Sequence, residues 1–146
     1  MIKPPYAAVL SAPSSRDTAP RASAGAMTFS IGICCNDDEI TAIEYLEPRA
    51  EAAPQTPLAK DAVRQLRAWL KDPRFSFGLP LAPAGTHFQR RVWEQISAIP
   101  AGQTSSYGEV AEAIRSGSRA VGNVCVVNPY PIVVPCHRVV AANHGL

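Results

Sequence analysis

Several features that define other protein classes are absent from this chain of 146 residues. No apolar run reaches the roughly 18 residues that a membrane helix needs. The N-terminal MIKPPYAAVL lacks a long apolar core followed by a small-residue cleavage site, so we expect neither a membrane protein nor a secreted one. The four cysteines form no C-x-x-C pair and no disulfide-framework spacing. Free thiols indicate a reducing compartment, the cytoplasm, or the nucleus if the organism is eukaryotic.

The chain also lacks the short motifs of several enzyme classes. It has no glycine-rich phosphate loop, no HExxH pattern and no GxSxG pattern. Its formal net charge is only +2, so a nucleic-acid partner would have to be met by a local patch rather than a global basic field. Apolar residues make up 47% of the chain, which excludes a mainly disordered protein and permits a hydrophobic core.

The first part of the chain has the pattern of strands followed by one helix. Residues 6–12, 28–35 and 39–46 are apolar or alternating runs, and residues 14–25 are predicted to form a long flexible loop. Residues 58–70 place apolar side chains on one helical stripe. Residues 1–76 are therefore predicted to form an α/β lobe, a small antiparallel sheet plus a helix.

Residues 77–146 are predicted to form a mainly α lobe. Thr86 is placed as the N-cap of a helix whose apolar residues recur at three- and four-residue steps. Ser106 and Glu109 form a capping box that opens a short helix, and Ser118 is placed as the cap of the next one. Two short helices joined by a glycine-containing turn are typical of a helix-turn-helix. Such pairs occur in DNA-binding proteins and in ordinary cores, so this pattern leaves both interpretations open.

The segment IVVPCHRVV, residues 132–140, places a thiol, an imidazole and a guanidinium in consecutive positions. A cysteine in a valine-rich run is usually a small buried hydrophobic residue. However, His137 and Arg138 are costly to bury, and a nearby imidazole or cation supplies the thiolate that a nucleophile needs. Adjacent residues of an extended segment point to opposite faces, so His137 would reach the sulfur through a water molecule or a bend. The residues alone leave a reactive and a structural Cys136 equally open.

A metal site is not predicted. Neighbouring Cys136 and His137 would strain to hold one zinc ion, and a tetrahedral site built from Cys34 or Cys35 with His87 is a weak alternative.

An ordered series of motifs leads up to the cysteine. Residues 135–139 read P-C-H-R-V. Upstream lie Gly85-Thr86-x-Phe88-Gln89-x-x-Val92-Trp93, Ile99-Pro100-x-Gly102-x-Thr104-x-x-Tyr107-Gly108-Glu109-Val110-Ala111, Arg119-Ala120-Val121-Gly122 and Asn128-Pro129. With this series the chain resembles the O6-alkylguanine-DNA alkyltransferases, or methylated-DNA–protein-cysteine methyltransferases. The resemblance is strong over about residues 76–146 and looser over the N-terminal lobe.

The resemblance implies a ribonuclease-H-like α/β lobe over residues 1–76 and a winged-helix or helix-turn-helix-like domain over residues 77–146. It implies DNA repair by direct, stoichiometric and irreversible transfer of the alkyl group of O6-alkylguanine, and of O4-alkylthymine, to Cys136. Such a methylated-DNA–[protein]-cysteine S-methyltransferase acts once and needs no cofactor, because the damaged DNA is the donor. The implied partner is double-stranded DNA, bound by a monomer through the minor groove with base flipping.

The same resemblance assigns roles to individual residues. Cys136 is the nucleophile and alkyl acceptor, and His137 is the water-mediated base. Arg119 would fill the space of the flipped nucleotide, on a recognition helix where Ala120 and Gly122 allow close approach to the groove. The other residues assigned to DNA or substrate binding are Tyr107 at the phosphate and extruded guanine, Asn128 as the brace of the turn before the active-site segment, and Arg138.

The chain departs from the family pattern at two places. The turn between Tyr107 and Arg119 is shorter than in the family, which we expect to trim the loop without tilting the helix. Family members also continue past the position of Leu146 with a glycine-rich loop and a helix, which close the alkyl pocket and supply a glutamate that orients the histidine. A gene fragment, a degraded pseudoenzyme or a partly represented chain would each account for this. We expect these residues alone to transfer alkyl groups slowly or not at all.

Two rival interpretations stay open. An alkyltransferase-like lesion-binding protein would flip the base without accepting its alkyl group, although such proteins usually replace the cysteine. A redox-sensing Cys136 would need a resolving cysteine, and none is identifiable by spacing. Cys125 falls inside the last predicted helix, where it is expected to be packed.

Overall fold

The computed structural model describes residues 6–13 and 28–141, so the loop predicted over residues 14–25 lies outside the described residues. The chain divides into two compact units, residues 1–82 and 83–146. The sequence prediction ends the first lobe at residue 76, but residues 78–82 hydrogen-bond to the helix and sheet of the first unit. In the described residues, no helix has the length and apolar character that a membrane crossing requires.

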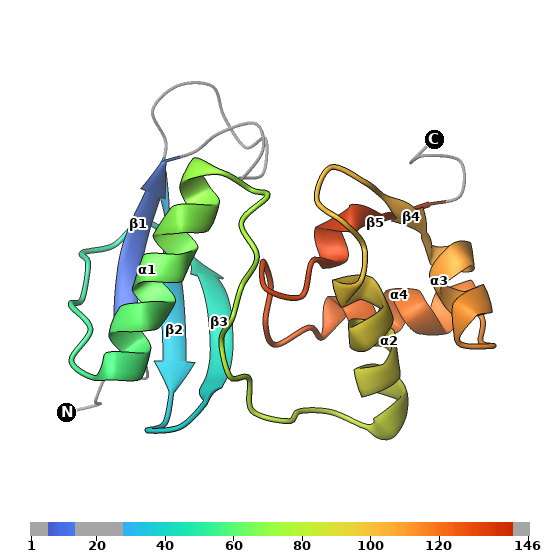
Figure 1. Cartoon of the computed structure of the whole chain (residues 1–146), viewed down its shortest axis with the longest axis horizontal. Helices are drawn as coiled ribbons and strands as arrows, with labels where there is room; N and C mark the ends of the chain where they lie inside the picture. The colour runs from blue at the N-terminus through green and yellow to red at the C-terminus, as the bar shows by residue number, and fades with distance from the viewer. Residues whose placement is uncertain (1–5, 14–27, 142–146) are drawn as a thin grey trace. The chain divides into compact units, whose positions relative to one another are not determined.

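The first unit is a three-stranded antiparallel sheet with one helix on it, which confirms the predicted α/β class (Figure 1). The strands β1 (Ala8–Pro13), β2 (Thr28–Cys35) and β3 (Ile40–Leu46) lie in the order β1-β2-β3. Helix α1 (Pro57–Lys71) packs against β1 and β2. Apolar side chains alternate along the strands and recur along the helix, so both elements bury one face. The core between them includes Leu10, Ile31, Ile33, Ala62 and Leu66.

Both edges of this sheet are partly covered by irregular segments. At the β1 edge, Val9 exchanges two backbone hydrogen bonds of 3.0 Å with Ala52. At the β3 edge, Ile40 donates to the Pro80 carbonyl and accepts from the Ala82 amide, both at 2.8 Å. Pairing of this kind hides the unpaired backbone groups that would otherwise invite edge-to-edge association.

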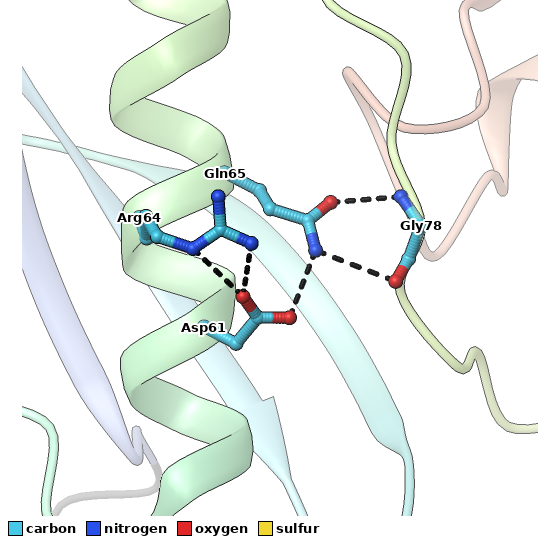
Figure 2. A network of polar contacts seen from close by, with 4 residues as sticks. All are labelled: Asp61, Arg64, Gln65 and Gly78. Carbon is cyan, nitrogen blue, oxygen red and sulfur yellow. Dashed lines mark hydrogen bonds and ion pairs between the residues drawn. The ribbon is translucent and has the colours of Figure 1, made fainter.

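A buried amide joins α1 to the segment that follows it (Figure 2). The Gln65 amide nitrogen donates to Asp61 at 2.9 Å and to the Gly78 carbonyl at 3.3 Å, while its oxygen accepts the Gly78 N–H at 2.8 Å. Arg64 binds the same Asp61 carboxylate and holds the pKa of Asp61 below its ordinary value. These bonds satisfy a polar side chain that is only 4% exposed.

The second unit contains three α-helices, one 3₁₀ helix and a short parallel strand pair in its described residues. Its elements are α2 (His87–Ser97), β4 (Ser105–Ser106), α3 (Tyr107–Ala113), α4 (Ser118–Val126), the 3₁₀ helix η1 (Cys136–Arg138) and β5 (Val139–Val140). Val92, Ile96, Val110, Val121, Val124 and Val139 form its core. The predicted mainly α class is confirmed.

The start of α2 depends on one glycine. Thr86 caps the helix as predicted, and Gln89 completes a capping box by accepting the Thr86 N–H at 2.8 Å. Gly85 precedes the cap with φ of 79°, and a Cβ there would lie 2.8 Å from the Trp93 ring. Only glycine adopts this backbone conformation without strain, and only glycine fits against the ring.

The predicted helix pair is formed by α3 and α4, and its turn is a Schellman motif. Arg115 adopts the left-handed conformation with φ of 57°. Its backbone N–H donates to the Glu112 carbonyl at 3.2 Å, and the Ser116 N–H donates to the Ala111 carbonyl at 2.8 Å. The Ser106–Glu109 capping box opens α3 as predicted. The predicted cap of α4 is wrong by one residue: Gly117 is the N-cap, and Ser118 is already helical, so no side chain caps this helix.

Candidate active site

Cys136 is the first residue of η1, which makes the predicted extended segment wrong at this point. The Arg138 N–H donates to the Pro135 carbonyl at 2.9 Å and closes the 3₁₀ turn. The strand pair β4–β5 sets Ser105 opposite Val139. Because Tyr107 directly follows β4 and η1 directly precedes β5, this pairing holds the start of α3 beside the Cys136 turn.

Asn128 supports the sulfur from the end of α4. Its amide nitrogen donates to the Val134 carbonyl at 2.8 Å and to the Cys136 Sγ at 3.4 Å, and its oxygen accepts the Tyr130 N–H at 2.9 Å. The enclosed turn includes Ile132, whose φ of 78° is a strained value for a β-branched residue. Asn128, to which the family resemblance assigns the bracing of this turn, thus bonds to residues at both ends of the segment from Tyr130 to Val134.

The thiol of Cys136 hydrogen-bonds to a second thiol, that of Cys125 on α4. Such a pair titrates together, because a thiolate on one sulfur is stabilised by the other thiol and opposes its ionisation. The hydrogen bond lowers the pKa of Cys125. It is the main cause that raises the pKa of Cys136, with burial second and the Asn128 donor acting the opposite way.

Tyr107 completes the cluster around the two sulfurs. Burial raises the pKa of its phenol, and the nearby Cys125 and Cys136 raise it further. The ring also lies along α4, because a Cβ added to Gly122 would be 4.0 Å from Tyr107 Cε1. The side chains brought together are therefore those of three residues that the sequence analysis assigned to the site, Tyr107, Asn128 and Cys136, and that of Cys125, which it assigned to packing.

His137 and Arg138 differ in their surroundings. His137 is exposed at the surface, although desolvation by neighbouring protein atoms and the Arg138 charge lower the pKa of its imidazole. A neutral imidazole at neutral pH suits a base. The Arg138 guanidinium donates to the Ile99 carbonyl at 2.8 Å, just past the end of α2, so one of its donors has a structural role.

The N-terminal face of α4 carries the remaining predicted residues. Arg119 is exposed, Ala120 and Gly122 are half-buried, and no hydrogen bond or ion pair joins the Arg119 side chain to another described residue. The first backbone N–H groups of α4 receive no capping hydrogen bond from the side chain at the N-cap, because that residue is Gly117.

The alternative metal site finds no support in the described residues. Among them, no group of three or more histidine, cysteine or acidic side chains is arranged to hold a metal ion. Burial raises the pKa of the thiols of Cys34 and Cys35, which makes them poorer nucleophiles than Cys125.

Similarities to known proteins cover both units. A family model described as the DNA-binding domain of 6-O-methylguanine DNA methyltransferase matches residues 87–146. The chain is 48% identical over 89 residues to a methylated-DNA–protein-cysteine methyltransferase of Methanosarcina acetivorans, a match that covers 60% of this chain and 57% of the relative. It is 42% identical over 94 residues to the constitutive enzyme of Bacillus subtilis, covering 63% of this chain and 57% of that relative.

Solved structures of O6-methylguanine methyltransferases are also similar to this chain. The Mycobacterium tuberculosis OGT structure in complex with DNA has a TM-score of 0.68 at 36% identity, covering 80% of this chain and 74% of that one. A structure of the M. tuberculosis O6-methylguanine methyltransferase has a TM-score of 0.67 at 33% identity, covering 94% of this chain and 82% of that one. The chain spans little more than half the length of the curated relatives described above. Its sequence motifs, its fold and these matches together show that it belongs to the 6-O-methylguanine DNA methyltransferase family.

Proposed function

We propose that this protein repairs DNA by moving the alkyl group of O6-alkylguanine, and of O4-alkylthymine, onto the sulfur of Cys136. A carbon–sulfur bond forms, the carbon–oxygen bond breaks, and the released guanine takes up a proton. The product is a thioether, for which the cluster offers no hydrolytic route, so each molecule acts once. The observation that carries the proposal is the half-buried Cys136 sulfur held by Asn128 beside Tyr107.

The proposed partner is double-stranded DNA, bound by a monomer in its minor groove with the damaged base turned out of the stack. Support comes from the exposed Arg119 and the uncapped start of α4, whose backbone donors suit a phosphate. Gly122 and Ala120 keep the helix surface narrow enough for the minor groove. Extrusion of the base costs a few kcal/mol, which is least for a poorly paired damaged base.

His137 is proposed as the base that removes the Cys136 proton through a water molecule. Its lowered pKa keeps the imidazole neutral and able to accept that proton. Asn128 stabilises the resulting thiolate by donating to the sulfur. A reducing compartment, the cytoplasm, is proposed for the protein because a free acceptor thiol must persist there.

A second candidate function is lesion binding without transfer. The raised pKa of Cys136 favours it, because a protonated sulfur is a poor nucleophile. In that case, the protein would flip and mark the damaged base and leave its alkyl group in place.

One experiment separates the two functions. The protein and Cys136→Ala are each incubated with a duplex carrying one O6-methylguanine and with an undamaged duplex, and both binding and conversion to guanine are measured. Repair predicts conversion up to one equivalent of wild-type protein and none by Cys136→Ala, which still prefers the damaged duplex. Preference for the damaged duplex by both proteins without conversion would establish the lesion binder.

A further inference from the structure

The cluster contains two thiols, and only one of them has a place in alkyl transfer. Cys125 lies near the end of α4, and its side chain hydrogen-bonds to that of Cys136. Asn128 ties the two residues together: its backbone N–H reaches the Cys125 carbonyl at 3.4 Å, and its side chain reaches the Cys136 sulfur at 3.4 Å. Both cysteines are neither fully buried nor fully exposed, so a small oxidant can reach them.

We propose that Cys125 is a peroxide-sensing thiol that forms a reversible disulfide with Cys136 and so closes the alkyl-acceptor site under oxidising conditions. The two thiols would thus be a site of oxidative modification, with a hydroperoxide as the oxidant. Its effect on repair rests on the function proposed above, while the formation of the disulfide does not.

The chemistry balances with hydrogen peroxide as the oxidant. The Cys125 thiolate attacks one peroxide oxygen, becomes a sulfenic acid, and the other oxygen leaves as hydroxide and takes up a proton to give water. The Cys136 sulfur then loses its proton and attacks the sulfenic sulfur, the disulfide bond forms, and a second water leaves. Two thiols are oxidised by two electrons in total, and one peroxide is reduced to two waters.

The electrostatics of the pair favour this order of events. A sensing thiol must be ionised and accessible, and the hydrogen bond from Cys136 lowers the pKa of Cys125. The thiols on β2 are less easily ionised: burial is the main cause that raises the pKa of both Cys34 and Cys35, and the Thr56 hydrogen bond to Cys35 does not reverse that rise. A dithiol such as dithiothreitol would reverse the bond by thiol–disulfide exchange.

The disulfide can be detected without any assay of repair. Cleavage with trypsin after Arg119 and Arg138 releases residues 120–138 as one peptide that holds both thiols. The full chain is treated with hydrogen peroxide, and unreacted thiols are blocked. After digestion, the mass of this peptide and of its fragments is measured by mass spectrometry. We expect the loss of two hydrogens with a cross-link between positions 125 and 136, and full reversal by dithiothreitol.

Two variants make the result specific. Cys136→Ser should give no cross-link, and its Cys125 should instead progress to sulfinic acid that dithiothreitol does not reverse. The Cys34→Ser/Cys35→Ser double variant should form the cross-link as wild type does. Oxidation of wild type that leaves both thiols of the 120–138 peptide uncross-linked would overturn the proposal.

Alkyl transfer gives the second readout. Oxidised wild-type protein should lose transfer to an O6-methylguanine duplex completely and regain it after dithiothreitol. Retained transfer by fully cross-linked protein would overturn closure of the site. If reduced protein transfers nothing, the proposed function fails, and the mass of the peptide still decides whether the disulfide between Cys125 and Cys136 forms.

Discussion

Replacement of Asn128 by alanine should both weaken the second unit and change the reactivity of its thiol. The side chain makes two short hydrogen bonds to backbone groups of Val134 and Tyr130, residues that are 5% and 4% exposed. Leaving a buried polar group without its partner costs about 1–3 kcal/mol, so the two losses together predict roughly 2–6 kcal/mol of destabilisation. Loss of the donor to Cys136 should also raise the pKa of that thiol further.

Asn128→Asp separates these contributions. The carboxylate can still accept the Tyr130 N–H but can no longer donate to the Val134 carbonyl or to the sulfur. Its negative charge opposes ionisation of Cys136, so its thiol should be the slowest to react. Asn123→Ala serves as the control, because Asn123 is exposed on α4, the helix that precedes Asn128, and helix propensity changes the stability of the protein by less than about 0.7 kcal/mol.

The assays are urea unfolding and iodoacetamide labelling of Cys136 across a pH series, read by fragmentation of the 120–138 peptide. The order of labelling rates should be wild type, Asn128→Ala, then Asn128→Asp, with the control equal to wild type. An Asn128→Ala protein with unchanged urea midpoint and unchanged labelling would refute the view that this side chain supports the site.

The remaining predictions concern the framework around the site. Gly85→Ala should cost at least about 1–2 kcal/mol in urea unfolding because of its positive φ and the adjacent ring, and an unchanged midpoint would contradict the close packing. Arg115→Gly should raise the unfolding free energy by up to roughly 1 kcal/mol by relieving the left-handed strain, and a loss of stability would be inconsistent with the Schellman turn. Gln65→Leu should lower stability by about 1–2 kcal/mol, since it removes three hydrogen bonds, whereas exposed Gln95→Leu should have little effect. The lowered pKa of His137 means that the unfolded chain binds its proton more tightly, so stability should fall as pH drops below about 6.5; His137→Gln should remove part of that fall, and identical pH curves would argue against it.

Local signals were sufficient to predict most elements of the fold. Apolar alternation predicted β2 with its bounds, and the Ser106–Glu109 pattern predicted the start of α3, because both depend on neighbours in the sequence. The short pair β4–β5 was not predicted, since two-residue strands carry no periodicity and their pairing joins distant residues. The cap of α4 was misplaced because Ser118 is a common cap residue and the glycine before it gives only a weak signal.

The sequence predicted those site residues that belong to recognisable motifs, but not the local conformation or the contacts between distant residues. P-C-H-R-V singled out Cys136, but the segment after Pro135 coils into a 3₁₀ turn, which an apolar run does not indicate. Cys125 was missed because its contact with Cys136 depends on how the chain folds back between α4 and η1. One signal was available in the sequence. Cys125 lies on the same helix face as Gly122 and only three residues before Asn128, which indicates that it is near the site.

The most direct test is to locate the alkyl group after repair. The protein is incubated with a duplex whose O6-methylguanine carries a deuterated methyl group, and the 120–138 peptide is fragmented. The account predicts one labelled methyl per repaired base, bound to the sulfur at position 136 and stable to dithiothreitol. Restored guanine with Cys136 unlabelled, or with the label on Cys125, would contradict it.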